Sequence, residues 1–216
     1  MLSAFRGRGP EQTCNTETLA GLLNLGQSEP KLLVRDGEAL PEGGMAVNAY
    51  CLFCETGKCD FVAHAVKQVF ECEAISPKQI QHTWDKGQYI DREHYLLPGY
   101  VFVYSEEEIS NPQEIRRRLD RIIRCLRDTG MEYRLQGADE QFALMILRKG
   151  GVIGRTEVTE TDGRFTITDE TFEGIPVEIL KVDRRNKRMK IEMLVANNKV
   201  QTWVEYEIVG QGDVNR

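Results

Sequence analysis

The chain has 216 residues, of which 41% are hydrophobic and 29% are charged, and its formal net charge is −6. This composition is that of an ordinary folded protein with one large or two small domains. No apolar run is long enough for a membrane span. The negative net charge excludes a surface that is basic throughout, but it does not exclude a local cationic patch. The first residues lack the apolar core of a signal peptide, so we expect a cytoplasmic protein.

Residues 1–44 differ from the rest of the chain. They are rich in Gly, Pro and polar residues and end in the loop sequence Pro41-Glu42-Gly43-Gly44. Met45 then stands just before the first convincing strand. Two interpretations stay open: the functional chain begins at Met45 and the upstream part is a start-site artefact, or residues 1–44 are a real, partly disordered extension.

Residues 45–150 show a mixed pattern of helices and strands. Strands are predicted at 50–54 and 100–104, and a strand with a hairpin or loop between residues 74 and 89. Apolar residues recur at helical spacing through 61–70 and 139–149. Asn111-Pro112 opens a further helix, and we predict that its apolar face runs from Ile115 to Leu126.

Residues 151–163 are predicted as a linker, because Gly150-Gly151 ends the last helix and Thr-rich polar sequence follows Arg155. Beyond it the helical period disappears. About five short strands are predicted, at 164–168, 175–182, 188–194, 200–204 and 207–209, and such spacing indicates a small barrel over 164–216. The predicted fold class is α+β, with a mixed sandwich-like domain joined by a linker to an all-β barrel.

No residue pattern indicates catalysis or a metal. Cys51 and Cys54 form a C-x-x-C, but on a strand this odd spacing sends the two sulfurs to opposite faces, whereas metal-binding pairs occupy tight turns. The three histidines are scattered, and no nucleophile–base pair or nucleotide-binding fingerprint is present. We expect reduced core thiols, no metal, no cofactor and no enzymatic activity.

A basic cluster is the strongest local signal. Residues 181–190 hold six of the 28 Lys and Arg residues and one of the 34 acidic residues. The cations of this basic hairpin are Lys181, Arg184, Arg185, Lys187, Arg188 and Lys190. A turn that projects them outward can neutralise several phosphates of RNA or DNA. The alternative is a solvated hairpin tip that only keeps the protein soluble.

Two other segments have a structural and a functional interpretation. Arginines recur through 116–127, which is typical of the polar face of an amphipathic helix and less so of a nucleic-acid or acidic-protein contact. Leu97-Pro98-Gly99-Tyr100 forms a Pro-Gly corner before a strand of β-branched and aromatic residues. By spacing alone this corner is a structural turn with Leu97 and Tyr100 in the core, and the alternative is an apolar docking edge.

The order of these features resembles the NusG family of transcription elongation factors. Its opening aromatic strand and small-residue turn are similar to residues 50–58, its Pro-Gly-Tyr segment to residues 96–103, and its C-terminal KOW barrel to residues 174–193. The resemblance covers residues 48–209. Within the family the chain resembles the LoaP antiterminators, through residues 151–154 and 181–188. One departure is Pro176, which stands where the KOW motif commonly has a second glycine.

The resemblance implies an NGN domain over 45–150 and a KOW (SH3-like) barrel over 164–216. The NGN domain would bind the clamp helices of the largest RNA polymerase subunit through Phe53, Leu97, Pro98, Gly99 and Tyr100. The KOW barrel would bind a nascent RNA hairpin through the six cations of the basic hairpin, with DNA near the transcription bubble as a further partner. The implied function is antitermination on a target operon.

Two alternatives stay open beside this interpretation. The chain can be a general elongation factor whose barrel binds a protein, such as a ribosomal subunit or a termination factor, in place of RNA. It can also be a ribosome-associated RNA-binding protein, although the Pro-Gly corner argues against that class.

Overall fold

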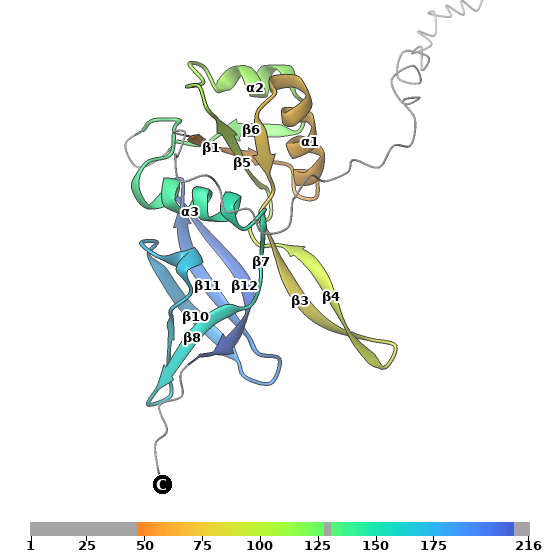
Figure 1. Ribbon diagram of the computed structural model, residues 1–216, viewed down its shortest axis with the longest axis vertical. Coiled ribbons are helices and arrows are strands. Elements are labelled where there is room, and N and C mark those ends of the chain that lie inside the picture. The colour runs from red at the N-terminus through yellow and green to blue at the C-terminus, as the bar shows by residue number, and fades with distance from the viewer. Residues whose placement is uncertain (1–46, 128–130, 210–216) are drawn as a thin grey trace, which may run out of the picture. The chain divides into compact units, whose positions relative to one another are not determined.

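The computed structural model describes residues 47–127 and 131–209 (Figure 1). The predictions for residues 1–44, including the choice at Met45, lie outside the described residues. The described chain mixes helices with a larger share of strands, as the α+β prediction requires. None of the described helices is both long and apolar enough to cross a membrane.

The first sheet has four strands in the order β2-β5-β1-β6, all antiparallel. Its strands are β1 (Asn48–Cys54), β2 (Glu73–Ile75), β5 (Tyr100–Ser105) and β6 (Ile122–Cys125). The central pair is fixed in register with Tyr50 opposite Val103. The predicted strands at 50–54 and 100–104 are therefore confirmed as β1 and β5.

Both faces of this sheet are buried, which explains the continuous apolar runs of β1 and β5. Leu52 and Val101 face α1 (Cys59–Phe70), which packs on one side. Phe102 and Tyr104 face α3 (Gly137–Arg148), where the Tyr104 hydroxyl donates to the Ala143 carbonyl at 2.7 Å. Figure 1 shows the two helices on different sides of the strands. The helices predicted at 61–70 and 139–149 are confirmed.

The long helix predicted after Pro112 is wrong beyond its first turns. Helix α2 covers only Gln113–Arg118, and Leu119 is already extended. Residues Ile122–Cys125 form the edge strand β6, which pairs with β1. Helical spacing from Ile115 to Leu126 is real, but the β-branched pair at 122 and 123 favours a strand, and the open edge of β1 supplies the partner.

A long hairpin, β3 (Lys78–Asp85) and β4 (Gln88–Tyr95), follows β2. Its two turn residues, Lys86 and Gly87, both have positive φ angles, of 48° and 88°. This geometry matches the right-handed twist of the two strands. The short strand β7 (Val152–Ile153) pairs in parallel with β3 and makes the sheet three-stranded.

The C-terminal strands form a five-stranded, barrel-like sheet in the order β10-β11-β12-β8-β9. Its strands are β8 (Thr156–Thr161), β9 (Arg164–Ile167), β10 (Val177–Asp183), β11 (Arg188–Val195) and β12 (Asn198–Ile208), with the 3-10 turn η2 (Glu170–Phe172) between β9 and β10. Met189, Ile191 and Met193 alternate into its core. The predicted small barrel is confirmed as a five-stranded, barrel-like sheet.

Two boundaries differ from the sequence prediction. The segment predicted as a linker, residues 151–163, contains β7 and β8, because alternate residues such as Thr156 and Val158 are buried and β8 pairs with both β12 and β9. The separate strands predicted at 200–204 and 207–209 are one strand, β12, whose first part pairs with β11 and whose last three residues pair with β8.

One hydrophobic core joins the first sheet, α3 and the five-stranded sheet. Phe142 of α3 is its clearest bridge. Its ring lies 5.8 Å from that of Phe102 in β5, in an edge-on geometry, and 6.3 Å from that of Phe172 in η2, in a stacked geometry. Because the barrel shares this core, tests of its function require the full chain.

Candidate nucleic-acid and polymerase interfaces

The Pro-Gly corner, residues 97–100, turns the chain into β5. The Tyr100 N–H donates to the Leu97 carbonyl at 3.1 Å, and Gly99 has a φ of +90°. A Cβ at Gly99 would lie 3.0 Å from Phe53 Cε2 and 3.3 Å from the Cys54 carbonyl oxygen. Glycine is needed here both for the left-handed backbone and for the close approach to β1.

The structure brings the five predicted polymerase-binding residues together but buries most of them. The side chain of Leu97 is fully buried and that of Tyr100 is 6% exposed. Phe53 is half-buried and contacts Tyr100 edge-on at 5.3 Å between ring centroids. Pro98 is the exposed member of the set, while Gly99 is buried. A partner of this corner therefore meets Pro98 and the open part of Phe53.

Charged and polar groups surround the corner. The Arg124 guanidinium lies 5.6 Å from the Phe53 ring centroid and donates to Asn198 Oδ1 at 2.9 Å, which links β6 to the start of β12. Burial raises the pKa of Tyr100 to about 12, a shift that the Cys51 thiol increases and Arg124 opposes.

A pair of thiols lies behind the corner. Cys51 and Cys54 point to opposite faces of β1, as predicted, and belong to different core clusters. Cys54 instead meets Cys59, with 3.5 Å between the sulfurs. Hydrogen bonds from the Cys54 thiol and from the Gly99 N–H, the latter at 3.2 Å, lower the pKa of Cys59 because both donors stabilise its thiolate. No group of residues that could hold a metal ion lies within the described ranges.

The basic hairpin is formed by β10, a turn at residues 184–187 and β11, as predicted. The Asp183 carboxylate organises the turn by accepting from the side chain and backbone of Asn186, at 2.8 and 3.1 Å, and from Arg188 Nε at 3.3 Å. These donors lower the pKa of Asp183, the Asn186 side chain most of all. The turn thus has a defined shape although it is exposed.

The six cations of this hairpin are not equivalent. Arg184 makes a bidentate ion pair with Glu160, at 2.6 and 3.2 Å, and its guanidinium lies 4.8 Å from the Phe165 ring centroid. Arg188 pairs with Asp183 and lies 4.8 Å from the Trp203 ring centroid. These contacts give both arginines structural roles within the barrel.

The remaining cations are available to a partner. Arg185 and Lys187 are exposed and have no ion-pair partner among the described residues. Lys181 and Lys190 lie directly opposite each other on β10 and β11. Like charges at such positions destabilise a sheet, and a bound polyanion would relieve the repulsion. The hairpin therefore combines two unpaired cations at its turn with two mutually repelling cations on its strands.

The second arginine cluster, predicted on one helix, is dispersed over several elements. Arg118 pairs with Glu114 in α2, Arg121 with Glu55, and Arg127 lies 4.7 Å from the Tyr133 ring centroid. Arg116 and Arg117 are exposed on α2. The interpretation as the polar face of one long helix is wrong because the helix ends at Arg118.

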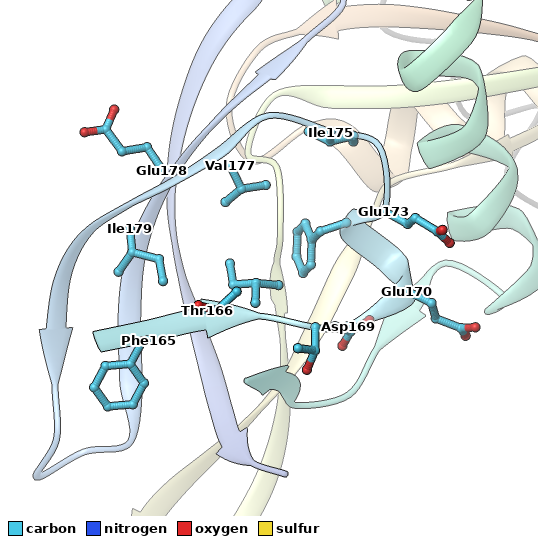
Figure 2. A pocket seen from close by; sticks show the side chains of 12 residues that line it. Phe165, Thr166, Asp169, Glu170, Glu173, Ile175, Val177, Glu178 and Ile179 are labelled. Carbon is cyan, nitrogen blue, oxygen red and sulfur yellow. The ribbon is translucent and has the colours of Figure 1, made fainter. Parts of the chain in front are cut away.

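The five-stranded sheet also has a groove of mixed polarity between its two end strands, β9 and β10 (Figure 2). The groove has a volume of about 710 Å³, and Phe172, Ile175, Val177 and Ile179 lie along it. Figure 2 shows the carboxylates of Glu170, Glu173 and Glu178 pointing away from these apolar side chains. Each end strand pairs with one neighbour in the sheet, so both offer backbone groups to an added strand.

Sequence reasoning missed the exposed aromatic pair of the β3–β4 hairpin, Trp84 and Tyr89. Their side chains are 61% and 71% exposed, and their ring centroids lie 4.8 Å apart. The signal was present in the sequence, because Lys86-Gly87 suits a two-residue turn and aromatic residues flank it.

No family model matches the sequence, and no curated protein matches it. Among solved structures, the chain is similar to one described as domain interaction in Thermotoga maritima NusG, with 14% identity and a TM-score of 0.43. The similarity covers 74% of this chain and 94% of that one. A similarity at this level does not decide function, so the proposals below depend on the residues and contacts of the chain itself.

Proposed function

We propose that the chain is a non-enzymatic transcription antitermination factor of the NusG type, closest in kind to the LoaP antiterminators. Residues 45–150 act as an NGN domain that binds RNA polymerase, and the five-stranded sheet acts as a KOW barrel that binds nascent leader RNA. The observation that carries the proposal is the basic hairpin, in which Arg185 and Lys187 lack ion-pair partners within the described chain and Lys181 faces Lys190.

RNA fits this surface for an electrostatic reason. The chain as a whole is acidic, at −6, so a concentrated cationic hairpin selects for a polyanion against the general repulsion. Structured RNA is recognised mainly through its backbone and shape, and a protruding turn with a defined geometry suits that mode. The Asp183 network supplies that geometry.

We assign polymerase binding to the Pro-Gly corner because its sequence resembles the Pro-Gly-Tyr segment of the NusG family. Pro98 and the open part of Phe53 are the groups that the clamp helices of the largest polymerase subunit can meet first. Arg124, which covers Phe53 and holds Asn198, lies beside them. A wider contact requires the Arg124–Asn198 hydrogen bond to open.

Binding to both the polymerase and the leader RNA explains antitermination as a shift of equilibrium. A factor that binds the elongating state of the polymerase better than the paused state favours elongation by that difference in affinity. RNA binding by the barrel raises the local concentration of the factor at one operon. We expect this to occur in the cytoplasm, with DNA near the transcription bubble as an additional contact.

The test is single-round transcription through a terminator, on templates with and without the leader stem–loop of the operon that neighbours the gene. The wild-type protein is expected to increase readthrough only on the leader template. Arg185→Glu with Lys187→Glu removes the increase, whereas Arg116→Glu with Arg117→Glu makes the same charge change on α2 and preserves it. Equal readthrough by the two double variants would contradict RNA recruitment through the basic hairpin.

A second candidate function is supported by the groove between β9 and β10 and its row of apolar side chains. It suits an extended segment of a protein partner, which would add a strand to the barrel and place apolar side chains beside Val177 and Ile179. The chain would then be a general elongation factor. Leader-independent readthrough that is lost in Ile179→Lys, but kept in the Arg185→Glu, Lys187→Glu variant, would favour this second function.

A further inference from the structure

The β3–β4 hairpin ends in two aromatic side chains that face water. Trp84 and Tyr89 lie directly opposite each other in the strand register, and their rings meet at an interplanar angle of 73°. Such an edge-on pair covers the face of only one ring, so further aromatic surface stays open. Two large aromatic rings exposed at one site are unusual on the surface of a folded protein and indicate a binding site for a partner.

Polar contacts hold this hairpin against the barrel. The Gln79 side chain of β3 donates to the Trp203 carbonyl of β12. Three residues further along β3, the His82 backbone N–H donates to Glu205 Oε1 at 2.8 Å, and its ring nitrogen Nδ1 lies 3.1 Å from Glu205 Oε2. These bonds hold β3 against β12. The aromatic end of the β3–β4 hairpin and the turn of the basic hairpin line one hollow.

The hollow has a volume of about 660 Å³ and strongly unequal charge. Its cationic lining consists of Arg155, Arg185, Lys187 and Arg188. Among the described residues that line the hollow, Glu205 is the one acidic residue. Its carboxylate already contacts Arg155 at 3.5 Å and His82 at 3.1 Å. The hollow therefore offers a net positive charge beside two aromatic rings.

We propose that this hollow binds an unpaired nucleotide of the RNA whose stem contacts the basic hairpin. The base stacks on Trp84 and Tyr89, and the flanking phosphates lie at Arg185 and Lys187. This inference rests on the proposed RNA-binding function and adds single-stranded recognition to it. Aromatic stacking beside a cationic groove is the combination by which proteins bind single-stranded nucleic acid. Of the four cations, Arg155 and Arg188 already contact Glu205 and Asp183, so Arg185 and Lys187 are the two placed at the phosphates.

The experiment compares two RNA probes on the full chain. One is the leader stem–loop alone, and the other is the same stem–loop with an unpaired adenosine tail. The tail is expected to tighten binding by the wild-type protein about tenfold, in line with the stacking of one base. Trp84→Ala and Tyr89→Ala remove this gain and leave the affinity for the bare stem unchanged. Phe61→Ala is the matched control, because Phe61 is 59% exposed on α1 and is not among the residues lining the hollow.

Fluorescence gives a second readout that does not depend on affinity. The chain has two tryptophans, so Trp203→Phe leaves Trp84 as the sole tryptophan. The tailed RNA is expected to quench its emission, and the bare stem is not. A deoxyadenosine tail on the same stem that gives an equal gain supports stacking through the base, which RNA and DNA share.

The outcomes separate this inference from the proposed function. If the bare stem binds and loses affinity in Arg185→Glu with Lys187→Glu, but neither tail adds affinity or quenches Trp84, the hollow does not bind a nucleotide and the proposed function stands. If the bare stem fails to bind at all, the proposed function itself is contradicted. Weaker polymerase binding by Trp84→Ala, with no change in the effect of the tail, would overturn the inference in favour of a protein contact.

Discussion

The Pro-Gly corner and the basic hairpin both reverse the chain next to a strand, but they are stabilised in opposite ways. The corner is fixed by burial: Leu97 is fully buried and Gly99 lies against Phe53. The basic hairpin is fixed by polar contacts around Asp183 at an exposed turn. The corner therefore couples any binding role to the stability of the core, whereas the hairpin separates the two.

This difference decides which variants are informative. At the corner, only Pro98 is exposed enough to be changed without disturbing the fold. At the basic hairpin, Arg185 and Lys187 can be substituted without loss of stability. Arg184 and Arg188 also contact aromatic rings of the barrel, so their substitution affects the fold.

Leu97→Asp places a carboxylate in the core and is expected to cost about 4 kcal/mol of unfolding free energy or more. Pro98→Asp, one residue away, is expected to change it by no more than about 1 kcal/mol and to weaken polymerase binding. Urea unfolding followed by circular dichroism measures the first effect, and binding to purified polymerase the second. Equal stability of the two variants would show that the corner is not part of the core.

Alkaline pH tests the burial of Tyr100. Its pKa in the folded protein, about 12, lies above its ordinary value of 10.0, so the folded state holds this proton more tightly. The contribution of this bound proton to the free energy of unfolding is fully present below pH 10.0. It is lost as the pH rises towards 12, which lowers the free energy of unfolding by roughly 2 kcal/mol. Tyr100→Phe cannot titrate, so its stability relative to wild type should increase over this interval. A constant difference between the two proteins would contradict the burial.

Gly99→Ala tests the close approach of the corner to β1. Gly57 is the matched control, because its φ of +79° is also left-handed but nothing lies within 4 Å of an added Cβ. Both alanines strain the backbone, and only the one at Gly99 presses on Phe53. We expect Gly99→Ala to cost about 1 kcal/mol more than Gly57→Ala. Equal losses would mean that conformation alone explains the glycine.

The hairpin should give the smallest effects on stability. Arg184→Ala is expected to lower the thermal midpoint, because it removes the bidentate pair with Glu160 and the contact with the Phe165 ring. Arg185→Ala should leave the midpoint unchanged. Thermal unfolding of the two variants side by side checks this, and a loss in Arg185→Ala would reveal a structural role for that residue.

Much of the fold could be predicted from the sequence because its signals are local. Continuous apolar runs place β1 and β5, apolar alternation places β11, and the glycines at 150 and 151 end α3. The error at Ile122–Cys125 arose because the same apolar residues fit a helix, and only the unpaired edge of β1 decides for a strand. Strand β8 was missed for a similar reason, since its Thr and Glu residues become a strand by pairing with β12.

The candidate sites divide in the same way. The cationic hairpin could be predicted because its residues are contiguous, but the sequence does not reveal that Arg184 is paired with Glu160 on another strand. The burial of Leu97 depends on how the sheet, α3 and the barrel share one core. The hollow beside Trp84 depends on contacts between residues more than a hundred positions apart, such as His82 and Glu205, separated by 123 positions.

The most direct test of RNA binding by the basic hairpin is a salt titration of the full chain with the leader stem–loop. Affinity should fall steeply with salt for the wild-type protein, as expected when cations displace counterions from phosphates. Arg185→Glu with Lys187→Glu should weaken binding and reduce the logarithmic slope by roughly one for each lost phosphate contact, while Arg116→Glu with Arg117→Glu should change neither. A slope that is the same in all three proteins would contradict the account.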